Sequence, residues 1–211
     1  MIGIFGGTFD PIHYGHLRSA LEVKDIFGLN EVRLIPCANP PHREQPTVGA
    51  DMRLQMLALA IKNQPGLKID TRELDRYDSY KTPSYMVDTL KSLRQEFPTE
   101  PLLLFIGSDA FTHLTGWHQW QQLFDYAHIV VMTRPGFETQ QLNDFFKARR
   151  AKGINELAQA NAGKLCFQQV TQLDISATAI RNIIADKKNP GFLLPDAVIE
   201  YIKQHQLYEA Y

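Results

Sequence analysis

The first sixteen residues, MIGIFGGTFDPIHYGH, contain the pattern on which the predicted fold depends. Residues 1–5 form a short apolar run that ends at two glycines, which is typical of a buried strand stopped at the edge of a sheet. Apolar or small residues then recur at helical spacing from 15 to 27, up to Gly28. The opening therefore predicts a strand, a glycine-rich loop and a helix in succession.

The same alternation continues along the chain. Continuous apolar runs predict further strands, because strands of parallel sheets are buried on both faces. These runs lie at 32–36, 67–70, 102–106, 128–132 and 165–169. Helical patterns lie at 51–61 with Asp51 as the N-cap, 84–97, 117–124, 138–162 with a break near Gly153, 176–185 and 195–205. Strands that alternate with helices predict a doubly wound α/β fold with a mostly parallel, Rossmann-like sheet, and residues 1–211 form one domain.

In such a fold, ligands bind beyond the carboxyl ends of the strands, where the strand order reverses. This rule predicts that several loops share one rim. They are residues 6–16, 39–43, 107–109, 133–136 and 175–181.

The composition of the chain limits the classes of partner and the cellular location that we expect. The chain has 211 residues, a formal net charge of −1 and two cysteines, Cys37 and Cys166. Nucleic-acid binders usually carry a basic surplus, so we expect no nucleic-acid partner and a local anion site instead. With no CxxC pair, no signal-peptide pattern and no long apolar run, we expect free thiols, no membrane association and a cytoplasmic location. The sequence carries no signal for an oligomeric state.

The first loop carries the strongest chemical signal. Gly6 and Gly7 allow the backbone to approach a ligand closely, and His13 and His16 bracket the start of a helix, beside Thr8. A helix N-terminus presents free N–H groups that suit phosphate. The loop is neither a Walker A motif nor a GxGxxG fingerprint. The alternatives are a glycine turn with two packing histidines, or structural zinc, for which third and fourth ligands are missing.

A second segment, ISATAIR at 175–181, predicts another anion site. Ser176 is a candidate N-cap, and Thr178 and Arg181 are three residues apart on one helix face. Arginine suits phosphate because its donors form a planar fork. Taken alone, this pattern is more typical of an ordinary capped amphipathic helix with a solvated arginine.

Together the two segments resemble a known superfamily. His13-Tyr14-Gly15-His16 is similar to the HxGH signature, and residues 175–181 are similar to the ISxTxxR signature, of the nucleotidyltransferase α/β phosphodiesterases. The whole chain resembles one family among them more closely, the bacterial nicotinate-nucleotide adenylyltransferases. The segments that carry this likeness are residues 6–16, 39–43 (NPPHR), 83–85, 107–109, 116–117 and 134–136.

The resemblance implies adenylyl transfer from ATP to nicotinate mononucleotide, with Mg²⁺, giving deamido-NAD and pyrophosphate. It implies that ATP phosphates are held by catalytic His13, His16 and Arg181, assisted by Gly6, Gly7, Thr8, Ser176 and Thr178, with Phe9 shielding the site or packing in the core. It implies that the nucleotide site is lined by Gly107, Asp109 and Arg134. It implies that the pyridine nucleotide is faced by His42, Arg43, Tyr85, Met86 and Trp117. We expect no protein metal ligands.

One position departs from the family pattern. Met86 stands where relatives often have threonine. If the backbone N–H contacts the pyridine carboxylate, methionine serves equally well; if the hydroxyl does, acid-versus-amide selectivity changes. The alternatives are therefore the same transfer to nicotinamide mononucleotide or phosphopantetheine, a cytidylyl transfer, and a nucleotide sensor without turnover.

Overall fold

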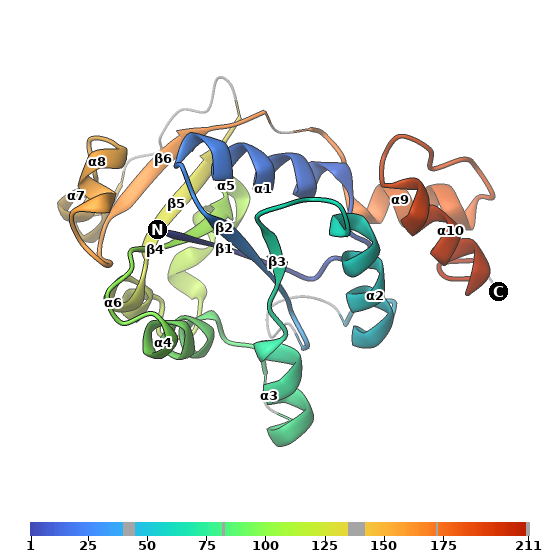
Figure 1. Ribbon diagram of the computed structural model, residues 1–211, viewed down its shortest axis with the longest axis horizontal. Coiled ribbons are helices and arrows are strands. Elements are labelled where there is room, and N and C mark those ends of the chain that lie inside the picture. The colour runs from blue at the N-terminus through green and yellow to red at the C-terminus, as the bar shows by residue number, and fades with distance from the viewer. Residues whose placement is uncertain (40–44, 82, 135–141, 172, 210–211) are drawn as a thin grey trace.

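The structure, a computed structural model, describes residues 1–39, 45–81, 83–134, 142–171 and 173–209. A six-stranded sheet lies at its centre, with the strand order β3-β2-β1-β4-β5-β6 and parallel pairing between all described neighbours (Figure 1). The strands are β1 (Ile2–Gly7), β2 (Glu31–Pro36), β3 (Leu67–Ile69), β4 (Leu102–Gly107), β5 (His128–Thr133) and β6 (Leu165–Gln169). The predicted α/β class and all six predicted strands are confirmed, and the sheet is wholly parallel.

Helices cover both faces of this sheet. They are α1 (Tyr14–Ile26), α2 (Ala50–Ile61), α3 (Arg72–Tyr80), α4 (Met86–Glu96), α5 (Ser108–Thr112), α6 (Leu123–Tyr126), α7 (Asp144–Arg149), α8 (Ile154–Ala158), α9 (Ala177–Ala185) and α10 (Asp196–Gln204). Two single 3₁₀ turns, η1 (Leu114–Gly116) and η2 (Trp120–Gln122), precede α6. None of the described helices combines the length and apolarity that a membrane crossing requires.

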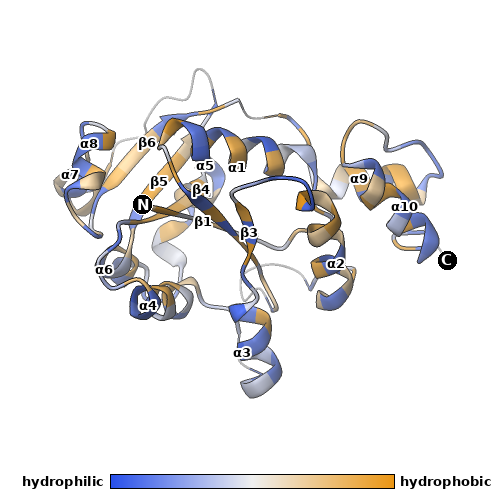
Figure 2. Cartoon of the chain, in the orientation of Figure 1, coloured by the Kyte–Doolittle hydropathy of each residue, from blue (hydrophilic) through white to orange (hydrophobic). Residues whose placement is uncertain are grey.

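Two apolar cores result from the alternation of side chains along the strands. Phe105 of β4 belongs to the core that contains α1, α2 and α10, whereas its neighbour Leu104 belongs to the core that contains α4 and α6. Figure 2 shows that hydrophobic residues, in orange, are concentrated on the strands, and that the helices carry both hydrophobic and hydrophilic residues. Burial on both faces explains why the strands are continuous apolar runs.

Three helix predictions were wrong in detail. Gly49, not Asp51, is the N-cap of α2, and Asp51 lies in the first turn, where a carboxylate favours the positive end of the helix dipole. The predicted helix at 117–124 is broken, because Trp117 is extended and Gln119 is left-handed, with φ +50°. Helix α3 was not predicted at all. The predicted break near Gly153 is confirmed, since Gly153 is the N-cap of α8.

The carboxyl ends of the strands meet at one edge of the sheet. Gly7 pairs with Pro36, and Gly107 pairs with Met132, so the loops after β1, β2, β4 and β5 leave from the same edge. Strand order reverses between β1 and β4, and the loops of these two strands flank the switch point where ligands bind in this architecture. The predicted rim is confirmed for its described parts; residues 40–43 and 135–136 lie outside the described residues.

Candidate functional site

Two histidines lie at the start of α1, directly beyond β1. His13 is the N-cap of α1, and its ring stacks on that of His16, with 3.7 Å between the ring centroids and an interplanar angle of 27°. Phe9, 1% exposed, meets the His16 ring edge-on at 5.2 Å. Phe9 therefore packs in the core and supports one face of the histidine pair.

Burial makes His13 an unusual imidazole. The residue is 5% exposed, and its Nδ1 has no hydrogen-bond partner among the described residues. Burial lowers its pKa from 6.5 to about 4, because the charged form loses hydration. The ring is therefore neutral near pH 7. A buried polar atom without a partner calls for an explanation, and a ligand at the rim supplies one.

The second predicted segment lies against the first. Ser176 is the N-cap of α9, and its hydroxyl accepts a hydrogen bond from the Ala179 N–H at 3.1 Å, as predicted. Arg181 donates from Nη1 to the carbonyl oxygen of Asp10 at 2.7 Å. Its Nη2 donates to Thr178 Oγ1 at 3.2 Å. The guanidinium and the histidine-bearing loop are thus joined although they are far apart in sequence.

Gly15 lies where the first loop approaches the second segment. A Cβ added there would lie 2.9 Å from His13 Nδ1 and 3.4 Å from the carbonyl oxygen of Ile175. A side chain at this position would displace the His13 imidazole, whereas the Ile175 carbonyl oxygen lies at ordinary contact distance. The glycine between the two histidines is therefore a steric requirement of the site.

The ends of β4 and β5 supply further polar groups to this rim. Asp109 lies exposed in the first turn of α5, and a Cβ at Gly107 would be 2.5 Å from its Oδ1. Arg134, directly after β5, pairs with Asp174 at 3.5 Å between Nη2 and Oδ1. This pair connects the end of β5 with the segment that leads into α9.

Tyr85, Met86 and Trp117 gather on the other side of β1. Tyr85 is the N-cap of α4, and its ring lies 4.4 Å from that of His118. A Cβ at Gly6 would be 2.8 Å from Met86 Cε, so the methionine reaches the first loop. Trp117 packs against the same apolar core as Tyr85 and Met86. The predicted residues His42 and Arg43 lie outside the described residues.

Hydrogen bonds tie this aromatic region to the end of β2. Ala38 N donates to Ser84 Oγ at 3.3 Å, and Ser84 N donates to the Asn39 carbonyl at 3.1 Å. Cys37 and Cys166 are free cysteines, as expected. Burial raises the pKa of Cys37 to about 12, so its sulfur stays a thiol and is a poor nucleophile.

Sequence reasoning missed two residues that hold the first loop, Arg53 and Tyr208. Arg53 is 1% exposed and donates to the carbonyl oxygens of Thr8 at 2.6 Å and Val48 at 3.1 Å. Tyr208 donates its hydroxyl proton to Asp10 Oδ1 at 2.6 Å. These contacts join distant segments, and no local pattern could have revealed them; only the position of Asp10 inside the first loop was a hint.

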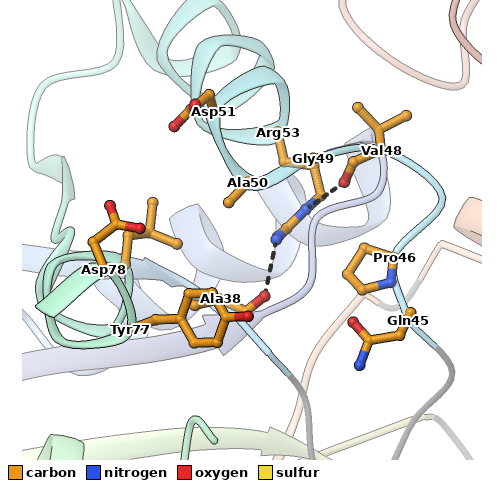
Figure 3. Close-up of a pocket in the computed structure, with 11 residues that line it drawn as sticks. Ala38, Gln45, Pro46, Val48, Gly49, Ala50, Asp51, Arg53, Tyr77 and Asp78 are labelled. Carbon is orange, nitrogen blue, oxygen red and sulfur yellow. Dashed lines mark hydrogen bonds between the residues drawn. The ribbon is translucent and has the colours of Figure 1, made fainter. Parts of the chain in front are cut away.

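A cavity of about 260 Å³ lies behind the first loop, between α2 and α3 (Figure 3). Arg53 crosses its wall and donates to the carbonyl oxygens of Val48 and Ala38. Asp51 and Asp78 also line it. Two carboxylates repel a polyphosphate, so we place the anion site at the histidines and not in this cavity.

The state of His13 can be tested by titration. Because its pKa in the folded protein lies below 6.5, the ring binds a proton only as the pH falls toward 4, and it stays neutral from pH 5 to 8. We expect the NMR signals of the His13 imidazole to shift with a midpoint near pH 4 in the ligand-free protein. A midpoint near 6.5 would show that the ring is hydrated and charged like a surface histidine.

Comparisons with known proteins agree with this geometry. The cytidylyltransferase-like family matches residues 4–183. The chain is 47% identical to the "Probable nicotinate-nucleotide adenylyltransferase" of Methylococcus capsulatus over 212 residues, which cover 99% of each chain. It is 46% identical to the protein of that name from Hahella chejuensis, covering 99% of this chain and 96% of the relative.

A solved structure shares the fold. It is the Plasmodium falciparum nicotinic acid mononucleotide adenylyltransferase complexed with NaAD, with a TM-score of 0.73 at 19% identity, covering 98% of this chain and 96% of that one. At this low identity the likeness shows the fold alone, whereas the two bacterial relatives are 46–47% identical over 99% of this chain. By its sequence and its architecture, this chain is a member of the nicotinate-nucleotide adenylyltransferases, within the cytidylyltransferase-like family.

Proposed function

We propose that the protein transfers the adenylyl group of ATP to nicotinate mononucleotide and releases deamido-NAD and pyrophosphate. The observation that carries this proposal is that Arg181 bonds to the carbonyl oxygen of Asp10, in the same loop that leads to the stacked His13–His16 pair. Imidazole and guanidinium donors beside two helix N-termini suit a polyphosphate. Family membership supports the choice of substrates.

The reaction requires positioning more than proton transfer. A phosphate oxygen of the acceptor attacks the α-phosphorus of ATP, a new P–O bond forms, and the bond to the β-phosphate oxygen breaks as pyrophosphate leaves. The acceptor phosphate is already an anion, so no general base is needed. Donors fixed in advance must bring two polyanions together and stabilise charge on the α-phosphate and on the leaving group.

We assign those donors to the first loop and to α9. His13 and His16 would donate to phosphate oxygens, together with Arg181 and the Thr8 hydroxyl. Gly6 and Gly7 would let backbone N–H groups approach, and Ser176 and Thr178 would shape the N-terminus of α9. The remaining assignments on the nucleotide side are Phe9, Gly107, Asp109 and Arg134.

The acceptor would lie on the opposite side of β1. Trp117 and Tyr85 offer aromatic faces for the pyridine ring, with His42 and Arg43 assigned to the same substrate. Met86 offers only its backbone N–H to the pyridine carboxylate. Its contact with the first loop, through the space beside Gly6, would link acceptor binding to the phosphate site.

The side chains of this chain fit a Mg²⁺ ion that is bound to the phosphates of the nucleotide and not to a set of protein ligands. Among the described residues, no group of three or more His, Cys, Asp or Glu side chains could hold a metal ion. Asp10, the carboxylate of the first loop, is already bonded to Tyr208 and to the Thr47 N–H. Mg²⁺ bound to the triphosphate would neutralise part of its charge, while protein groups orient it.

A reaction that consumes ATP, in a chain with free thiols, also supports a cytoplasmic location.

A direct assay tests the proposal and chooses the acceptor. The purified protein is incubated with Mg-ATP and either nicotinate or nicotinamide mononucleotide, and pyrophosphate release is measured. We expect release with nicotinate mononucleotide and at least tenfold less with the amide, because only the acid offers a second anion to the site. Equal release would contradict the assigned specificity. The absence of release with both would indicate a nucleotide sensor.

Substitution of His16 tests the phosphate site. Removal of one preorganised donor typically lowers turnover by about 10²–10³, so we expect His16→Ala to lower kcat by at least that order while the circular dichroism spectrum is unchanged. His205→Ala is the matched control, because His205 is exposed and stacks only on Tyr201 of α10. Near-normal turnover of the His16→Ala protein would remove the imidazole from the mechanism.

A further inference from the structure

Tyr208, near the end of the chain, reaches the loop that carries the phosphate site. Its hydroxyl donates to Asp10 Oδ1 at 2.6 Å, across 198 residues of sequence. Both side chains are buried, Asp10 at 5% and Tyr208 at 9% exposure. A short hydrogen bond to a buried carboxylate is among the stronger contacts in proteins. The carboxylate and burial raise the pKa of Tyr208, so the hydroxyl remains a proton donor.

Asp10 connects the Tyr208 hydroxyl to other residues of the site through further hydrogen bonds. Its Oδ2 accepts from the Thr47 N–H at 2.7 Å, and its carbonyl oxygen accepts from Arg181 Nη1 at 2.7 Å. The preceding residue is Phe9, whose ring supports His16. A shift of Asp10 would therefore move both the guanidinium of Arg181 and the face of the His16 imidazole.

The backbone on both sides of this contact is held in a costly conformation. Tyr208 has φ +65°, Gln206 has φ +52° and Phe9 has φ +51°, all in the left-handed region that favours glycine. Such conformations are unfavourable for residues other than glycine and persist where their surroundings fix them. Together with the burial of both side chains, these conformations indicate that the fold holds the Tyr208 hydroxyl in place.

We propose that Tyr208 and Asp10 are positioning residues for adenylyl transfer: the hydroxyl holds Asp10, and Asp10 sets the places of Arg181 and of the Phe9–His16 pair. Neither side chain touches the reacting atoms. The inference rests on the proposed function, because the groups it positions are those assigned to the polyphosphate. The segment after α10, which carries Tyr208, would thus contribute to the geometry of the nucleotide site.

A purely structural role would have different consequences. In that case, loss of the hydroxyl would lower the free energy of unfolding but leave the turnover of each folded molecule unchanged. A positioning role instead lowers kcat in a fully folded sample, since a displacement of about 1 Å can cost up to about 100-fold in rate. The KM of the mononucleotide, which binds on the other side of β1, would stay within twofold.

The decisive variant is Tyr208→Phe, which removes one oxygen atom and keeps the buried ring. We expect kcat to fall about tenfold, and a calorimetric Kd for an ATP analogue with a non-cleavable α,β bridge to rise about threefold or more, with the circular dichroism spectrum unchanged. Tyr201→Phe is the matched control: Tyr201 lies in α10, and no hydrogen bond of its hydroxyl is recorded within the described residues. Normal kcat for Tyr208→Phe, or equal losses for both variants, would overturn the proposal.

A double-mutant cycle tests whether the hydroxyl acts through Asp10. If it does, Tyr208→Phe combined with Asp10→Asn loses no more than about twofold in kcat beyond Asp10→Asn alone, because both changes break one chain of contacts. Independent, additive losses would contradict it. The calorimetric measurement needs no turnover. A wild-type protein that binds the analogue tightly but releases no pyrophosphate therefore defeats the proposed function, while weaker binding by Tyr208→Phe still supports the positioning role.

Discussion

The hydrogen bond from Arg181 to the Asp10 carbonyl is the constraint on which the site depends, because it joins segments 171 residues apart. Neither segment forms an anion site alone. The first supplies two imidazoles at a helix start, of which that of His13 is neutral, and the second supplies the positive charge of Arg181. The parallel sheet delivers the first loop to the rim, and α9 brings the second against it. Gly15 leaves room for the His13 imidazole where the two segments approach each other.

The electrostatics of the site follow from this local convergence. With a net charge of −1, the molecule as a whole offers no attraction to ATP. Burial keeps His13 neutral, so the site avoids the cost of a desolvated cation while no anion is bound. Donors that are already in place need not reorganise during the reaction, which is the most effective form of charge stabilisation. Asp10, Arg53 and Tyr208 hold the loop that carries these donors.

The strands and the shared rim of their loops could be predicted from the sequence, because buried parallel strands are continuous apolar runs and glycines mark where they end. The donors assigned to the phosphates remain a prediction. Helix α3 was not predicted, since the stretch RELDRYDSY contains few apolar residues at helical spacing. The prediction of a helix at 117–124 was wrong because Gln119 has a left-handed backbone conformation, which interrupts the helix. The spacing of apolar residues gives no sign of this interruption. Arg53 and Tyr208 were missed for a different reason. Their partners, Thr8 and Asp10, lie 45 and 198 residues away, and a single sequence does not encode that proximity locally.

The most direct test is a crystal structure with the non-cleavable ATP analogue bound. We expect phosphate oxygens within hydrogen-bonding distance of the imidazoles at positions 13 and 16 and of the guanidinium at 181, at the switch point between β1 and β4. A triphosphate bound elsewhere, for example in the cavity beside Asp51 and Asp78, would contradict the assignment of the site. So would a complex in which the guanidinium and the two rings contact no phosphate.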